Sequence, residues 1–175
     1  MPFLRIPMLI SLLLITPSWI KYQEILPHRS PIKSKAQIKK EFNQREINCL
    51  ADNIYMEAAT ESEDGQIAVA QVTINRTHRK WYPKTVCGVV YENDQFSWTK
   101  TTRKPKRDSY IYSQIKKLAS LVFTNRKKSS IIGTNVLYYH ADYIEPPAWT
   151  ANCVQVASIG THVFYAREKD IEYNN

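Results

Sequence analysis

Apolar residues recur along residues 47–58 at the spacing of one helix face. They occupy positions i, i+3, i+4, i+7, i+8 and i+11, namely Ile47, Leu50, Ala51, Ile54, Tyr55 and Ala58. This spacing predicts an amphipathic helix. At about 100° per residue, Glu57 lies roughly 90° from the centre of the stripe. A carboxyl group at such an apolar border can lose part of its water, which raises its pKa. It then keeps a proton near neutral pH, as a general acid must. A glutamate at such an edge is more often an ordinary solvated residue, so the pattern alone leaves both interpretations open.

Two further helices follow. Residues 66–76 are apolar on most sides, which predicts a helix in the centre of the core. A third helix can be capped by Asp108 or Ser109, and its apolar face consists of Ile111, Ile115, Leu118, Ala119 and Val122. Between these two helices, residues 85–91 fit either a short helix or an extended segment.

Beyond Gly133 the pattern becomes typical of strands, over residues 135–140, 155–159 and 161–165. Helices that precede a group of strands are typical of α+β proteins. The sequence therefore predicts a mainly helical domain with a small antiparallel sheet toward the C-terminus.

Residues 1–20 have the features of an export signal. Arg5 precedes an apolar run over residues 6–15, and Pro17 follows it. The run is short for a membrane span, which needs about 20 apolar residues. No A-x-A cleavage site follows, so a cleaved signal, an uncleaved N-terminal membrane anchor and a buried N-terminal helix all stay open. We expect export to the periplasm or the cell exterior.

Residues 21–45 carry basic clusters, two prolines and little apolar periodicity, which predicts a basic linker. The folded domain is then expected over residues 46–168, with a short tail at residues 169–175.

Composition and charge narrow the class of protein. With 175 residues, 43% hydrophobic side chains and only 4 Gly, the chain is neither collagen-like nor wholly disordered. The net charge is +8, and residues 1–46 contribute +5 of it. Further basic residues crowd into residues 100–107 and 126–128. Such patches favour an anionic partner, for example an envelope surface, or are solvated loops without a partner.

Several ordered segments resemble one known family. The stretch from Glu57-Ala-Ala-Thr-Glu61 through Gly65-Gln-Ile-Ala-Val to Asn75-Arg76 is similar to the G-E-A-R-G-E-x-x-E-G-Q-x-A-V-x…N-R signature of SleB-type cell-wall hydrolases. The family's later motifs follow in the same order, at residues 82–91, 95–98, 138–141, 147–149 and 159–165. Four positions depart from the signature, namely Met56, Ala59, Thr60 and Asp64.

This resemblance implies a lysozyme-like fold and an enzyme that cuts the glycan strands of peptidoglycan. Family members are lytic transglycosylases acting between N-acetylmuramic acid and N-acetylglucosamine, and their catalytic glutamate maps onto Glu57. One carboxyl group then serves as both acid and base, with no cofactor and no metal. A hydrolase would normally need a second carboxylate. Glu61 is the nearby candidate, although capping the next turn or pairing with a basic side chain is an equally good role for it.

Flat and amide side chains suit a sugar groove, because sugar rings stack on aromatic faces and their hydroxyls need directional partners. The candidate substrate-binding residues are Tyr55, Gln95, Phe96, Trp98, Tyr139 and His140. Each of them can equally belong to the core, although Trp98 is expected to be exposed, because it lies beside the basic loop at residues 99–107. His162 lies in a strand pattern and is expected to be a hydrogen-bonded structural histidine rather than a catalyst.

The resemblance also implies a disulfide between Cys49 and Cys87, because similar chains carry cysteine at both positions. Cys153 would then be the third thiol, outside that bridge. Three reduced, buried thiols are the alternative.

Other functions fit the residues less well. A zinc peptidase needs clustered ligands, and the four histidines form no H-E-x-x-H motif. A cysteine peptidase built on Cys87 or Cys153 with His140 has no local signature. A wall-binding module without activity is the serious alternative, given Met56, Ala59 and Thr60. We expect peptidoglycan as the partner, no nucleic acid, and a monomer.

Overall fold

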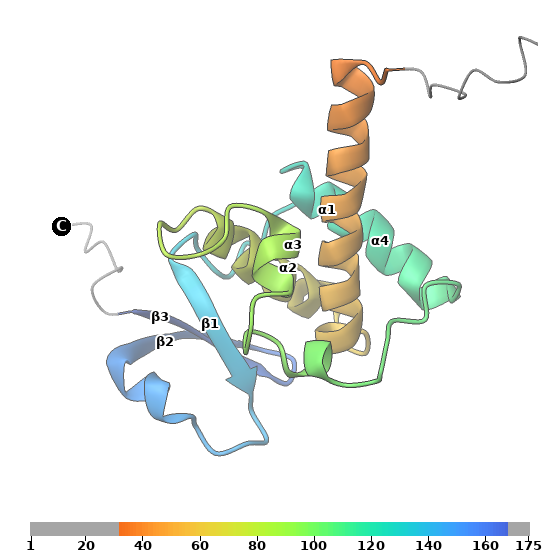
Figure 1. Cartoon of the computed structure of the whole chain (residues 1–175). Helices are drawn as coiled ribbons and strands as arrows, with labels where there is room; N and C mark the ends of the chain where they lie inside the picture. The colour runs from red at the N-terminus through yellow and green to blue at the C-terminus, as the bar shows by residue number, and fades with distance from the viewer. Residues whose placement is uncertain (1–31, 168–175) are drawn as a thin grey trace, which may run out of the picture. The chain divides into compact units, whose positions relative to one another are not determined.

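The computed structural model describes residues 32–167. The predicted export signal or anchor and the predicted tail lie outside the described residues. Among the described helices, none is long and apolar enough to cross a membrane. All helices and strands belong to a compact unit that begins at Lys35 (Figure 1).

The first helix, α1, spans Lys35–Ala58 and begins earlier than the sequence pattern predicted. Residues 35–45, expected to be part of a linker, form its first turns. Lysine, glutamine and glutamate favour helices, yet nearly all side chains of this segment are exposed, so they leave no apolar stripe to detect. From Glu46 onward most of the predicted face is buried, with Leu50 and Ile54 fully inside, while Ile47 and Tyr55 are partly buried.

Each of the next helices begins at a side-chain cap. In α2, Glu63–Thr77, the hydroxyl of Ser62 accepts a hydrogen bond from the Gly65 amide at 3.3 Å. The short α3, Val86–Val90, resolves the ambiguous segment as a helix, and Thr85 caps it.

The last helix, α4, spans Tyr110–Phe123, and its cap is Ser109, one of the two predicted residues. Its buried face contains Ile115, Leu118, Ala119 and Val122 as expected, but Ile111 is 54% exposed and Tyr112 takes its place. Tyr112 contacts α1 through the Tyr55 ring and the Asp52 carboxylate.

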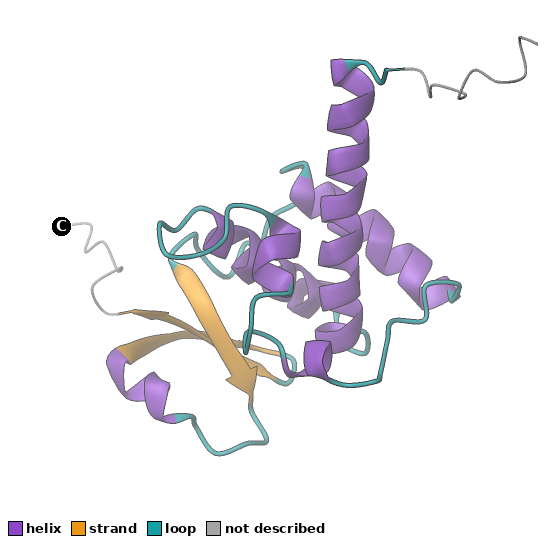
Figure 2. Ribbon diagram, viewed as in Figure 1, coloured by secondary structure: helices purple, strands orange, loops and turns teal. Residues whose placement is uncertain are grey.

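Three strands form the small antiparallel sheet: β1 (Val136–Ala141), β2 (Cys153–Ile159) and β3 (His162–Arg167). The strand order is β1-β3-β2, and Tyr139 pairs with Phe164. Figure 2 shows the sheet on one side of the helices. The predicted α+β class, mainly helical with a small antiparallel sheet, is confirmed. Two short 3-10 turns, η3 (Ser97–Lys100) and η4 (Ala148–Asn152), complete the fold.

The core has two parts, and α2 contributes to both. One part joins α1, α3 and α4 around Leu50 and Ile54. The other joins α2 to the sheet through Val69, Val72 and Phe164. Ala58, in the last turn of α1, belongs to this second part. The end of α1 is therefore where the helical layer meets the sheet.

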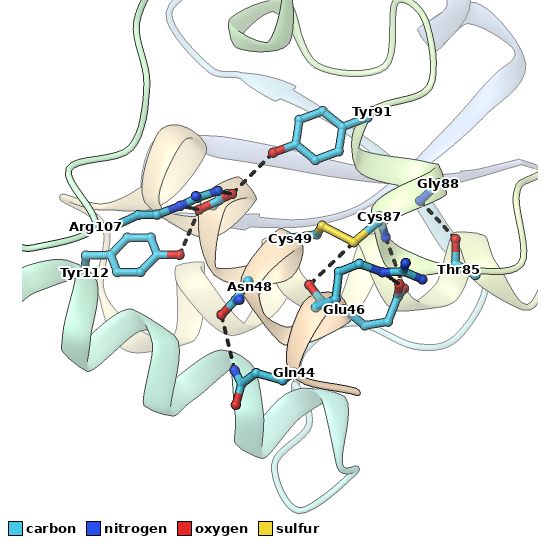
Figure 3. The surroundings of a disulfide bond; sticks show 12 residues. Gln44, Glu46, Asn48, Cys49, Thr85, Cys87, Gly88, Tyr91, Arg107 and Tyr112 are labelled. Carbon is cyan, nitrogen blue, oxygen red and sulfur yellow. Dashed lines mark hydrogen bonds and ion pairs between the residues drawn. A yellow bond between two sulfur atoms is a disulfide. The ribbon is translucent and has the colours of Figure 1, made fainter. Parts of the chain in front are cut away.

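The predicted disulfide between Cys49 and Cys87 is present and joins α1 to α3 (Figure 3). Beside it, Glu46 is buried, and its Oε2 accepts a hydrogen bond from the Cys87 amide at 3.2 Å. Cys153, at the start of β2, lies outside this bridge.

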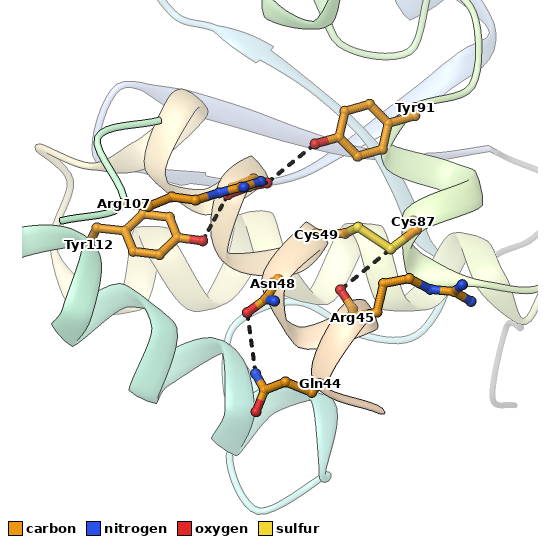
Figure 4. Close-up of polar contacts among 9 residues, drawn as sticks. Gln44, Arg45, Asn48, Cys49, Cys87, Tyr91, Arg107 and Tyr112 are labelled. Atoms are coloured by element: carbon orange, nitrogen blue, oxygen red, sulfur yellow. Dashed lines mark hydrogen bonds and ion pairs between the residues drawn. A yellow bond between two sulfur atoms is a disulfide. The ribbon is translucent and has the colours of Figure 1, made fainter. Parts of the chain in front are cut away.

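A polar network fixes the basic loop to α1. Tyr91, Arg107 and Tyr112 all donate to the buried carboxylate of Asp52, with the Tyr112 hydroxyl at 2.8 Å (Figure 4). The pairing with Asp52 raises the pKa of the Arg107 guanidinium further, so it stays charged. At least one residue of the basic loop therefore has a structural role.

Candidate active site

Glu57 lies in the last turn of α1 and is largely removed from water. This burial raises the pKa of its carboxyl, an effect opposed by a hydrogen bond from Tyr139 and by the charge of Arg76. The Tyr139 hydroxyl donates to Glu57 Oε2 at 3.4 Å. A carboxyl group with a raised pKa retains its proton closer to neutral pH, which a general acid requires.

Glu57 lines an open cavity of about 740 Å³ between the helices and the sheet. Five of the six predicted substrate-binding residues line the same cavity, namely Gln95, Phe96, Trp98, Tyr139 and His140. We call this cavity the groove. Segments far apart in the sequence, from α1, α2, the η3 region and the sheet, thus meet around one carboxyl group.

Tyr55 does not line the groove, and its expected place there is wrong. It precedes Glu57 by two positions, which turns it about 200° around α1. Its ring packs against Tyr112 of α4, with the ring centroids 5.7 Å apart.

Trp98 lines the groove but is only 6% exposed, so the expectation of an exposed indole is wrong. Its Nε1 donates to Asn53 Oδ1 at 3.2 Å, and Asn53 in turn donates to Thr73 Oγ1 on α2. Phe96 is also buried. Both rings therefore line the groove from buried positions rather than from an exposed rim.

Both ring nitrogens of His140 are hydrogen-bonded within the protein. Nδ1 lies 2.8 Å from the Ala141 carbonyl, which can only accept, so Nδ1 carries the proton. Nε2 then accepts from the Tyr165 hydroxyl at 3.0 Å. His140 therefore offers the groove its ring surface and no free polar group.

Sequence reasoning missed several groove residues. Met56, Arg76, Arg103, Tyr143, Ile144 and Trp149 all line it. Trp149 was part of a recognised motif, and its half-exposed ring is held against Tyr138, His140 and Tyr165. Its motif was the one available signal, because loop side chains have no periodicity that would reveal a shared cavity.

Glu61 does not line the groove. It accepts two hydrogen bonds from Thr161 in the β2–β3 turn, from the amide at 3.2 Å and from the hydroxyl at 2.6 Å. The sequence predicted that Glu61 caps the following turn or pairs with a basic side chain. This prediction is wrong, because the carboxylate accepts its hydrogen bonds from Thr161. Glu61 fastens the turn, and its position gives no support to a role as second carboxylate.

His162 lines the groove from β3, with its ring edge-on to Tyr139 at 5.2 Å between centroids. Burial lowers the pKa of its imidazole. Its Nδ1 is buried and has no hydrogen-bond partner among the described residues, so the expected hydrogen bonding is wrong for this atom.

Within residues 32–167, no group of three or more histidine, cysteine, aspartate or glutamate side chains is arranged to hold a metal ion.

Several known proteins are similar to this chain in sequence or in fold. The family model described as Cell Wall Hydrolase matches residues 60–165. The spore cortex-lytic enzymes of Oceanobacillus iheyensis and Bacillus subtilis are each 28% identical over 123 residues, or 70% of this chain. Those matches cover 42% and 38% of the relatives, so the chain spans about two fifths of their length.

Two solved structures are similar over nearly their whole length. The crystal structure of the catalytic domain of the Bacillus cereus SleB protein has a TM-score of 0.55 and 30% identity, and the match covers 70% of this chain and 90% of that one. The catalytic domain of the germination-specific lytic transglycosylase SleB from Bacillus anthracis also has a TM-score of 0.55, with 27% identity, covering 80% of this chain and 99% of that one.

Proposed function

The chain belongs to the cell wall hydrolase family, and we propose that it cleaves the glycan strands of peptidoglycan as a lytic transglycosylase, with Glu57 as general acid and base. The observation that carries this proposal is the desolvated carboxyl of Glu57 in a groove with aromatic walls. The Bacillus anthracis neighbour is named for the same reaction.

The proposed reaction has two steps. The protonated Glu57 gives its proton to the glycosidic oxygen, the bond from that oxygen to the muramoyl C1 breaks, and the electron pair leaves with the N-acetylglucosamine hydroxyl. The Glu57 carboxylate then takes the proton of the muramoyl C6 hydroxyl while O6 attacks C1. The product is a 1,6-anhydro ring, and Glu57 is protonated again.

The carboxylates of the groove favour this reaction over hydrolysis. A hydrolytic glycosidase uses a second carboxylate, about 5–5.5 Å or 6.5–9.5 Å from the first. Among the described residues that line the groove, only Asp94 offers a second one, and its side chain is 78% exposed and paired with Lys100. Glu61 is engaged by Thr161.

A peptidoglycan-binding module with weak activity is the second candidate. Met56 stands where the family signature has glycine and lines the groove beside Glu57, so this chain has a bulkier apolar wall there. We keep the predicted export as part of the proposal, because intact peptidoglycan lies outside the cytoplasmic membrane.

The test is digestion of purified peptidoglycan by the full chain, with the muropeptides analysed by mass spectrometry. We expect 1,6-anhydro-muramoyl ends. Reducing ends would instead establish a hydrolase, new amino termini a peptidase, and binding without cleavage the binding module.

Glu57→Gln should stay folded and lose cleavage by about 10²-fold or more. The matched control is Glu63→Gln, because Glu63 is an exposed residue paired with Lys127 and lies outside the groove. Full activity of Glu57→Gln would remove Glu57 from the mechanism.

A further inference from the structure

Arg76 is a buried cation in the groove, and only part of its guanidinium is hydrogen-bonded. It is 6% exposed and lines the cavity together with Glu57. Its Nε donates to the Leu137 carbonyl at 2.9 Å, which ties α2 to β1. Its Nη1 is buried and has no hydrogen-bond partner in the described part of the chain.

The surroundings of Arg76 hold its charge in place without neutralising it. The guanidinium carbon lies 5.5 Å from the ring centroid of Tyr82 and 5.4 Å from that of Phe96. Aromatic faces attract a cation but carry no formal charge. No salt bridge pairs Arg76 with a carboxylate among the described residues. Burying a cation in this way is costly, so its retention calls for a counter-charge at some stage of the reaction.

We propose that Arg76 is a positioning residue that stabilises the carboxylate of Glu57 whenever its proton has left. This inference rests on the proposed function, because only a reaction that cycles Glu57 between acid and carboxylate creates that charge. Before proton transfer, Glu57 is neutral and Arg76 lacks a counter-charge. After it, two opposite charges line the same groove, and because both side chains are largely buried, their attraction is stronger than it would be in water.

The direction of the effect follows from the other groups around Glu57. Tyr139 donates a hydrogen bond to it and so also favours the carboxylate. The remaining titratable groups of the groove are Asp94, Arg103, His140, Tyr143 and His162. Burial lowers the pKa of the His162 imidazole and so favours its uncharged form. Asp94, Arg103 and Tyr143 are exposed and screened by water, and the hydrogen-bonding groups of His140 are engaged with neighbours. The charge of Arg76 is therefore the main buried cationic influence on Glu57.

Removing the Arg76 charge has an expected signature. In Arg76→Gln the pKa of Glu57 rises further, so the alkaline limb of the pH–activity profile moves to higher pH by about one unit. The plateau rate falls, because the conjugate carboxylate is less stable and Glu57 is a weaker acid. Arg76→Lys keeps the charge and should shift the limb less than Arg76→Gln does.

The matched control is Arg79→Gln. Arg79 lies three residues after Arg76, and its side chain also donates to a backbone carbonyl, that of Thr134, at 3.1 Å. Unlike Arg76, it lies outside the groove. Its loss removes the same kind of structural contact without removing charge from the groove, so the pH profile should not move.

A second measurement does not depend on cleavage. The carboxyl ¹³C resonance of Glu57, assigned by its absence in Glu57→Gln, is titrated in the wild-type chain and in the Arg76→Lys, Arg76→Gln and Arg79→Gln variants. We expect its midpoint to rise in Arg76→Gln. An unchanged midpoint, or an equal rise in Arg79→Gln, overturns the inference. If the wild-type chain cuts no glycan, the proposed function fails, while the titration still decides the coupling between the two residues.

Discussion

Tyr139 and Glu57 lie 82 residues apart in the sequence and meet through one hydrogen bond, in which the tyrosine hydroxyl donates to Oε2 at 3.4 Å. Burial, followed by the nearby Glu57 charge, raises the pKa of Tyr139 well above its usual value, so the hydroxyl remains a donor over the working range of pH. The contact links α1 to β1 and so joins the helical layer to the sheet at the candidate catalytic group.

Tyr139→Phe should move the alkaline limb of the pH–activity profile to higher pH. The Tyr139 hydrogen bond lowers the pKa of Glu57, and without it burial acts with less opposition. Because the hydrogen bond is long, we expect the limb to shift by about half a pH unit. Rates of muropeptide release measured between pH 4 and 9 give this shift. Tyr138→Phe is the control, since it removes the neighbouring hydroxyl outside the groove. A shift toward lower pH would contradict this account.

As the pH rises above 4.5, the ordinary glutamate pKa, the folded Glu57→Gln variant should become increasingly more stable than the wild type. The pKa of Glu57 is raised by folding, so the wild type has its full stability below 4.5 and loses part of it as pH rises through the folded pKa. Between the two pKa values, each pH unit costs about 1.4 kcal/mol, and glutamine does not titrate. Urea unfolding of both proteins from pH 4 to 8 measures the difference. A difference that stays constant over this range would show that burial does not tune Glu57.

Glu61→Ala should weaken the fold by about 1–3 kcal/mol and leave the specific cleavage rate of the folded protein within about twofold. The loss follows from the two Thr161 hydrogen bonds to Glu61, and the retained activity follows from its position outside the groove. Thermal unfolding and muropeptide release, with Glu63→Ala as the exposed control, measure the two effects. A loss of cleavage comparable to that of Glu57→Gln would return Glu61 to the mechanism.

Gly160 gives an independent check on the same contact. It has a positive φ of 57°, and an added Cβ would lie 1.7 Å from Glu61 Oε2. Gly160→Ala should therefore destabilise the wild type more than it destabilises Glu61→Ala, because only the backbone strain remains in the second case. Equal losses in a double-mutant cycle would mean that the turn and Glu61 do not touch in solution.

Much of the fold could be predicted because local periodicity reports burial. The stripe at residues 47–58, the apolar second helix and the late strand pattern all correspond to elements of the structure. Periodicity did not predict the helix over residues 35–45, because that part of α1 has no buried face. It also placed Ile111 on the buried face of α4, where the adjacent Tyr112 is buried instead.

The site was harder to predict, because a groove is assembled from segments that are distant in sequence. An ordered set of motifs located Glu57 and five groove residues, but helix rotation turns Tyr55 away, and a turn 100 residues further on engages Glu61. The sequence motif includes Arg76 but assigns it no role. Only its burial among Tyr82, Phe96 and Leu137 distinguishes it from a solvated arginine. Long-range packing of this kind leaves no local pattern.

Reduction of the Cys49–Cys87 bridge should lower the free energy of unfolding while affecting the cleavage rate of the folded protein much less. The bond closes a separation of 38 residues, and the chain-entropy estimate for such a loop is about 4 kcal/mol. It holds α1 to α3, whereas Glu57 lies two turns further along α1 and is positioned by contacts with the sheet. Urea unfolding with and without a thiol reductant, compared with the Cys49→Ser/Cys87→Ser variant, measures the loss. The variant should show no response to the reductant, since its bridge is already gone. If mass mapping under non-reducing conditions finds Cys49 and Cys87 unlinked in exported protein, the bridge does not form in its own compartment, and α3 must be held to α1 by packing and by Glu46 alone.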